Sequence, residues 1–113
     1  GWHMPGGGIE RAEPALEAIT RELVEEAGIQ LIGAPTLFGF YSNHAIFPND
    51  HVALYRVGHE VWTKTQATSA GEIAEIRWVD PQNLPDGTTP GTQQRLLEIY
   101  AEAPISAHWQ PKT

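Results

Sequence analysis

The sequence has no cysteine, few cationic residues and no long apolar stretch. Without cysteine the chain can form no disulfide, thiolate nucleophile or zinc–thiolate site. Its 7 Lys and Arg residues against 14 Asp and Glu residues give a formal net charge of −7. This charge argues against a nucleic-acid polymer as the partner, because binding a phosphate backbone requires clustered cations. With no apolar span and no leader, we expect a cytoplasmic protein that does not bind a membrane.

A glycine turn followed by an acidic helix occupies residues 7–29. Glu22, Glu25 and Glu26 are spaced i, i+3 and i+4, so they share one face of a helix. Three neighbouring carboxylates repel one another unless a cation lies among them, and oxygen ligands suit Mg²⁺. The alternative interpretation is a solvated acidic face. Pro14 suits the first turn of this helix and Gly28 its end.

The spacing within this segment carries more information than the acidic cluster alone. The informative positions are Gly7, Glu13, Arg21-Glu22, Leu23, Glu25-Glu26 and Gly28-Ile29. With every defining position filled, this segment resembles the Nudix box, the signature of the Nudix hydrolase superfamily. Many relatives carry a glycine at the position of Ala12, which is a turn position and leaves the acidic side chains unchanged.

The resemblance implies an enzyme that hydrolyses a diphosphate linkage in a nucleoside diphosphate derivative, with Mg²⁺ or Mn²⁺ as cofactor. It identifies Glu25 and Glu26 as the first metal ligands and Glu22 as the next. The backbone carbonyl of Gly7 corresponds to a further ligand. Arg21 is expected to hold a glutamate in place rather than to contact the substrate.

Two more acidic residues have expected roles around the box. Glu13 is expected to fix the glycine loop, through Arg21. In this family a loop outside the box often supplies another carboxylate as metal ligand or general base, and Glu72 fits that role. Glu75 is the second candidate. An ordinary exposed loop glutamate is the alternative interpretation of Glu72.

Four residues near the loop 42–50 are candidate substrate contacts. Tyr41 and Phe47 could stack on a nucleobase, although aromatic residues near strand ends more often pack in a core. His44 and His51 could contact phosphate or carry protons, although isolated loop histidines are usually only polar. The sequence does not decide which nucleotide derivative is the substrate. ADP-ribose, sugar nucleotides, dinucleoside polyphosphates and damaged nucleoside triphosphates are the candidates.

The 113 residues, 41% of them hydrophobic, predict a single domain over 1–113. The family resemblance implies an α/β/α sandwich with a mixed sheet. The pattern predicts a closing helix whose inner side carries Leu96, Ile99 and Tyr100. The expected elements are strands at 35–41, at 51–57 continuing toward Trp62, and at 73–79, with the closing helix at 89–103.

The chain opens almost at the glycine turn, whereas a Nudix domain ordinarily has strands ahead of it. The expected fold is therefore N-terminally shortened, and a sheet edge would be left open. We expect a second copy to cover this edge in a homodimer, or the chain to be a truncated form of a longer protein. The alternative function is a non-catalytic nucleotide-binding or regulatory module. A Nudix-fold isoprenoid diphosphate isomerase is disfavoured, because that chemistry uses a cysteine.

Overall fold

The computed structural model describes residues 1–67 and 77–111. Its contacts divide the chain into two compact units. The box unit comprises Pro5–Thr36 and Tyr55–Arg77, and the hairpin unit comprises Gly1–Met4, Leu37–Leu54 and Trp78–Thr113. Each unit is described by itself, and the single domain over 1–113 stays a prediction.

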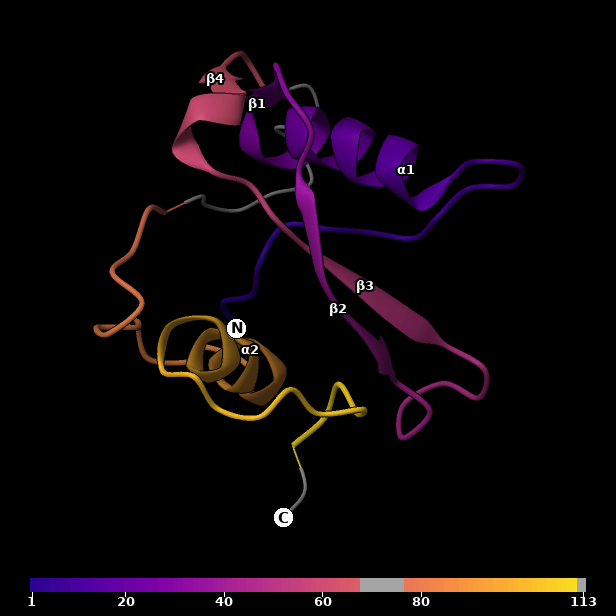
Figure 1. The fold of residues 1–113 in the computed structure, drawn as a ribbon, viewed down its shortest axis with the longest axis vertical. Coiled ribbons are helices and arrows are strands. Elements are labelled where there is room, and N and C mark those ends of the chain that lie inside the picture. The colour runs from indigo at the N-terminus through magenta and orange to yellow at the C-terminus, as the bar shows by residue number, and fades with distance from the viewer. Residues whose placement is uncertain (68–76, 112–113) are drawn as a thin grey trace. The chain divides into compact units, whose positions relative to one another are not determined.

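The box unit is built on one helix (Figure 1), whose winding changes along its length. The α-helix α1 spans Ala15–Glu22, with Pro14 at its N-cap, and continues as the π-helix η1 over Leu23–Ala27. Gly28 ends it in the left-handed region at φ 63°, where glycine lacks the steric penalty of other residues. The predicted helix is confirmed, whereas its π-helical end was not foreseen.

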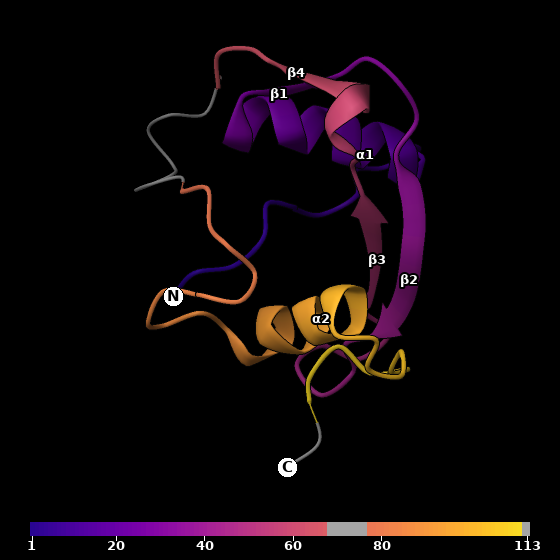
Figure 2. The same cartoon turned by 60° about the vertical axis from the view of Figure 1, so that its left-hand side comes forward.

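Two short strands follow the helix in the box unit. β1 (Ile29–Leu31) pairs antiparallel with β4 (Trp62–Lys64), and both lie beside the end of the helix (Figure 2). The 3-10 turn η2 (His59–Val61) precedes β4. The predicted continuation of the second strand toward Trp62 is therefore wrong, because the backbone turns at Gly58, whose carbonyl accepts the N–H of Val61 at 3.1 Å.

The hairpin unit contains most of a two-stranded sheet. β2 (Thr36–Ser42) pairs with β3 (His51–Arg56), which confirms both predicted strands to within about one residue at their ends. Asn43 and Asp50 close the loop between them. The Asn43 backbone N–H donates to the Asp50 carbonyl, and its side-chain amide donates to the Asp50 carboxylate, each at 2.9 Å.

The closing helix α2 spans Pro90–Tyr100, with Thr89 at its N-cap. It ends before the predicted residue 103, because Glu102 adopts a left-handed backbone at φ 57°. The inner face also differs from the prediction. Tyr100 is 57% exposed, and Leu96 and Ile99 are only half-buried. The buried positions of α2 are Gly91, Thr92, Arg95 and Glu98.

A polar cluster forms the centre of the hairpin unit. The Tyr41 hydroxyl donates to Glu98 Oε1 at 2.8 Å, and Arg95 Nη2 lies 3.2 Å from Glu98 Oε2. Arg95 also stacks on Tyr41 and Trp109, with its Cζ 4.2 Å and 5.1 Å from the ring centroids. Tyr41 and Arg95 are fully buried. Burial, followed by the hydrogen bond to Glu98, raises the pKa of the Tyr41 phenol.

The two α-helices and two antiparallel sheets of the described residues place the chain in the α/β class, as predicted. The layered sandwich stays a prediction, as do the shortened edge and its cover in a homodimer. Most of the predicted strand 73–79 lies outside the described residues, and residues 77–79 have no regular structure. None of the helices described in residues 1–67 and 77–111 is long and apolar enough to cross a membrane.

Candidate active site

The glycine loop approaches the helix closely at Gly7. A Cβ atom built on Gly7 would overlap the Glu22 carboxylate and would lie only 2.6 Å from its Cδ. The absence of a side chain therefore lets the loop backbone lie directly against Glu22. This places two of the predicted ligand residues together.

Arg21 joins the loop to the helix through Glu13. Its Nε donates to Glu13 Oε2 at 2.9 Å and its Nη2 to Glu13 Oε1 at 3.0 Å, a bidentate pair. Nη2 also donates to the Gly8 carbonyl at 3.2 Å. The predicted tie between Glu13 and Arg21 is confirmed.

This pairing has electrostatic consequences for both partners. The Arg21 guanidinium, followed by the backbone N–H of Glu10, lowers the pKa of Glu13 to about 2. The hydrogen bond with Glu13 in turn raises the pKa of Arg21. Glu13 therefore stays ionised and Arg21 stays positively charged at neutral pH.

The same guanidinium contacts two of the predicted metal ligands. Arg21 Nη1 lies 2.8 Å from Glu22 Oε1 and 3.4 Å from Glu25 Oε2. The exposed Glu10 is more distant, at 3.8 Å. Arg21 thus holds glutamates in place, as the family pattern implies.

Glu26, the third predicted ligand from the helix, has a different partner. Its Oε2 accepts the backbone N–H of Gly6 at 2.9 Å. The glycine loop therefore contacts the carboxylate face at two points, Gly6 on Glu26 and Gly7 against Glu22. Glu25 and Glu26 belong to the π-helical turn. This winding is rare in proteins overall, and where it occurs it is frequently found at functional sites.

The donor set can be compared with the needs of a hard divalent cation. The glutamate oxygens and the Gly7 backbone are the hard oxygen donors that Mg²⁺ and Mn²⁺ prefer. In residues 1–67 and 77–111 no three His, Asp or Glu side chains are already grouped to hold a metal ion. The chemistry of these donors fits such a cation, and Mg²⁺ commonly takes only one or two protein carboxylates and fills its other positions with water and phosphate.

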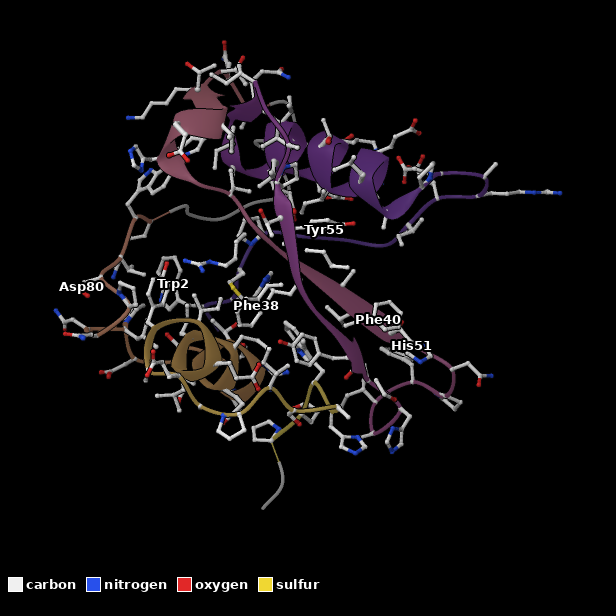
Figure 3. The ribbon with its side chains drawn as sticks, viewed as in Figure 1. Trp2, Phe38, Phe40, His51, Tyr55 and Asp80 are labelled. Atoms are coloured by element: carbon white, nitrogen blue, oxygen red, sulfur yellow. The ribbon has the colours of Figure 1, made fainter. Side chains whose placement is uncertain are left out.

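The structure describes only some of the remaining predicted site residues. Glu72 and Glu75 are outside the described residues. Phe47 and His44 are exposed in the loop of the hairpin unit, and His51 stacks on Phe40 with ring centroids 5.3 Å apart (Figure 3). Their contact with substrate stays a prediction.

Tyr41 is fully buried and its hydroxyl is bonded to Glu98. No ring face is therefore open to a nucleobase in this structure, and its position favours the packing role that the sequence also allowed.

Sequence reasoning did not foresee two backbone contributions to the site. The Gly6 N–H supports Glu26, and the Gly8 carbonyl supports Arg21. Every residue except proline carries both backbone groups, so residue identity alone cannot reveal these contacts. The run of three glycines was the available signal, because it lets a backbone approach neighbouring side chains closely.

The comparison with known families agrees with this geometry. The pattern of the NUDIX domain family matches residues 1–100. The chain belongs to the Nudix family. No solved structure matches it.

Curated relatives come from several bacteria. The chain is 29% identical over 99 residues to a protein of Bacillus subtilis named for 8-oxo-dGTP diphosphatase activity, covering 87% of the chain and 62% of that protein. It is 30% identical to an RNA pyrophosphohydrolase of Dinoroseobacter shibae, covering 88% and 72% of the two chains. It is 36% identical to an RNA pyrophosphohydrolase of Bartonella henselae, covering 76% and 49%. The chain thus spans about three fifths of the length of the Bacillus relative.

Proposed function

We propose that this protein hydrolyses a diphosphate linkage in a nucleoside diphosphate derivative, with Mg²⁺ or Mn²⁺ bound at the acidic helix. The main observation behind this proposal is how the three glutamates are held. Arg21 contacts Glu22 and Glu25, and the glycine loop donates to Glu26 and lies against Glu22. Membership of the Nudix family supports the same conclusion.

The residues of the box would have different roles in this reaction. Glu22, Glu25 and Glu26, with the Gly7 carbonyl, would hold the cation, which when bound supplies positive charge to the diphosphate and lowers the pKa of water. Arg21 orients the carboxylates, and Glu13 fixes Arg21 to the loop. This positioning matters because phosphoryl transfer depends on placement and charge more than on covalent chemistry by the protein. Glu72 remains our proposed further ligand or general base.

The substrate we propose is a small nucleotide rather than a polymer. The net charge of −7 disfavours a long anionic partner. The relatives' names span 8-oxo-dGTP and RNA, and a phosphate anhydride at a 5′ end is the chemistry these substrates share. A panel of 8-oxo-dGTP, ADP-ribose, a sugar nucleotide, a dinucleoside polyphosphate and a 5′-triphosphorylated RNA would separate these classes.

The proposal is tested by measuring turnover of this panel with Mg²⁺ and with Mn²⁺. We expect Glu25→Gln and Glu26→Gln to lower turnover by about 10²-fold or more while leaving the circular dichroism spectrum intact, because they remove charges that hold the cation. The matched control is Glu17→Gln in the first turn of the same helix, where we expect turnover to be kept.

The alternative, a non-catalytic nucleotide-binding or regulatory module, predicts a different result. Such a module would bind nucleotides without releasing products, with or without metal. Binding without turnover across the panel would therefore overturn the proposed hydrolase and favour this module.

A further inference from the structure

Two histidines that are far apart in the sequence lie side by side in the hairpin unit. His44 belongs to the loop after β2, and His108 belongs to the segment after α2. Their ring centroids are 5.2 Å apart, with ring planes at 66°. His44 is exposed and His108 is half-buried.

The backbone at His108 is held from two sides. It forms a parallel bridge with Ser42 at the end of β2. The Ser42 N–H donates to the Ala107 carbonyl, and the Trp109 N–H donates to the Ser42 carbonyl, each at 2.8 Å. From α2, Arg95 Nη1 donates to the carbonyls of His108 and Trp109 at 3.1 Å and 3.0 Å. His108 is thus presented by a fixed backbone, as a binding site requires.

The ring of His44 is oriented by Ser42. Its Nδ1 lies 2.8 Å from Ser42 Oγ. The other ring nitrogen, Nε2, is then the one that could bind a ligand. Within residues 1–67 and 77–111, neither this Nε2 nor the ring of His108 has a hydrogen-bond partner. A histidine whose one nitrogen is held by a hydrogen bond while the other is open has the arrangement of a metal-ligating imidazole.

The separation of the rings fits a shared ion. With metal–nitrogen bonds of about 2.0–2.1 Å, two imidazoles on one tetrahedral ion have centroids about 5 Å apart, and the observed separation is 5.2 Å. We propose that His44 and His108 together bind one divalent transition-metal ion of the Zn²⁺ class.

The chemistry of this site differs from that of the acidic helix. Imidazole selects Zn²⁺, Ni²⁺ or Cu²⁺ over Mg²⁺, so the two-histidine site stands independently of the proposed hydrolysis. Within the described residues no third His, Asp or Glu completes the set, which leaves positions for water or an external anion. A bound ion would join the loop 43–50 to the C-terminal segment and stabilise both.

The test follows the imidazole resonances of the full chain by NMR during a Zn²⁺ titration in excess Mg²⁺, which occupies hard oxygen sites. We expect His44 and His108 to shift together, while His3, His51 and His59 stay in place. His44→Asn should lower Zn²⁺ affinity by about tenfold or more, since Asn keeps a donor for Ser42 but lacks Nε2. His108→Asn should do the same.

The matched control is His51→Asn in the same hairpin, where we expect unchanged Zn²⁺ affinity. His44 is exposed, so His44→Asn keeps the test decisive even if His108→Asn impairs folding. Wild-type affinity in His44→Asn would overturn the proposal, and so would equal shifts of all five histidines.

Discussion

At the scale of single residues, Ala12 has an unfavourable backbone for its side chain. Its φ is 62°, in the left-handed region where a Cβ atom costs about 1–2 kcal/mol. It lies in the loop that Arg21 and Glu13 fix to the helix. The loop therefore contains local strain beside the candidate site.

We expect Ala12→Gly to raise the free energy of unfolding by about 0.5–1 kcal/mol, because relief of the left-handed strain exceeds the extra backbone conformational entropy that glycine loses on folding.

Gly28 provides the opposite case at φ 63°, where a Cβ would meet the Thr65 carbonyl oxygen at 2.6 Å. Gly28→Ala should lower the free energy of unfolding by about 1–3 kcal/mol.

Urea denaturation would measure both changes, with Gly8→Ala as the control because a Cβ there meets nothing within 4 Å. Equal effects of Ala12→Gly and Gly8→Ala would contradict the assignment of strain to Ala12.

The charge pair of Glu13 and Arg21 makes a prediction about pH. The pKa of Glu13 is about 2 in the folded chain, against an ordinary value of 4.5. A carboxylate with a lowered folded pKa stabilises the fold above its unfolded pKa and loses that contribution as pH falls toward the folded one. Stability should therefore decline between pH 4.5 and about 2.

The carboxyl ¹³C resonance of Glu13 would follow this titration. We expect it to keep its ionised shift well below pH 4.5, and Arg21→Gln to move its midpoint upward. A midpoint at the ordinary value in the unmodified protein would show that the guanidinium does not hold Glu13.

At the scale of elements, α2 depends on a buried ion pair. Arg95 and Glu98 are fully buried side chains 3.2 Å apart, although Arg95 Nε and Nη2 have no hydrogen-bond partner within the described residues. Removing one member leaves the other charge buried and uncompensated. The helix is therefore more sensitive at Arg95 than at its apolar positions.

We expect Arg95→Met to lower the free energy of unfolding by about 3–5 kcal/mol. The control in the same helix is Leu97→Ala, for which we expect less, about 1 kcal/mol, because Leu97 is 50% exposed. Chemical denaturation measures both, and an Arg95→Met loss no larger than that of Leu97→Ala would contradict a structural role for the pair.

Elements with strong local signals could be predicted from the sequence, and those set by tertiary contacts could not. Pro14 and Gly28 gave the limits of the first helix, and the local residue pattern at 35–41 and 51–57 predicted β2 and β3. The apolar residues of the closing helix predicted the wrong inner face, because Arg95 and Glu98 are buried through bonds to Tyr41, Ser106 and the backbone of His108. Such partners are distant in the sequence.

The candidate site was predictable to a similar extent. Helical spacing identified the carboxylates that share a face, whereas the family resemblance implied their role as metal ligands and the tie between Glu13 and Arg21. The support of Glu26 by the Gly6 N–H depends on how the loop folds back. The π-helical turn over Leu23–Ala27 has no clear sequence signal.

At the scale of the whole molecule, the candidate site is acidic, like the protein as a whole. The net charge is −7, and at the site the guanidinium of Arg21 faces the carboxylates of Glu13, Glu22 and Glu25. A small anionic nucleotide therefore needs further positive charge at this face to approach it. The proposed divalent cation provides that charge, so metal binding and substrate binding should be coupled.

Diffraction from crystals of the protein soaked in Mn²⁺ tests directly whether the acidic helix binds a divalent cation. We expect anomalous density beside Glu22, Glu25 and Glu26 in the unmodified protein, and its loss in the Glu25→Gln, Glu26→Gln double variant together with loss of turnover. Crystals without Mn²⁺ beside these side chains, combined with unchanged turnover in the double variant, would contradict the account.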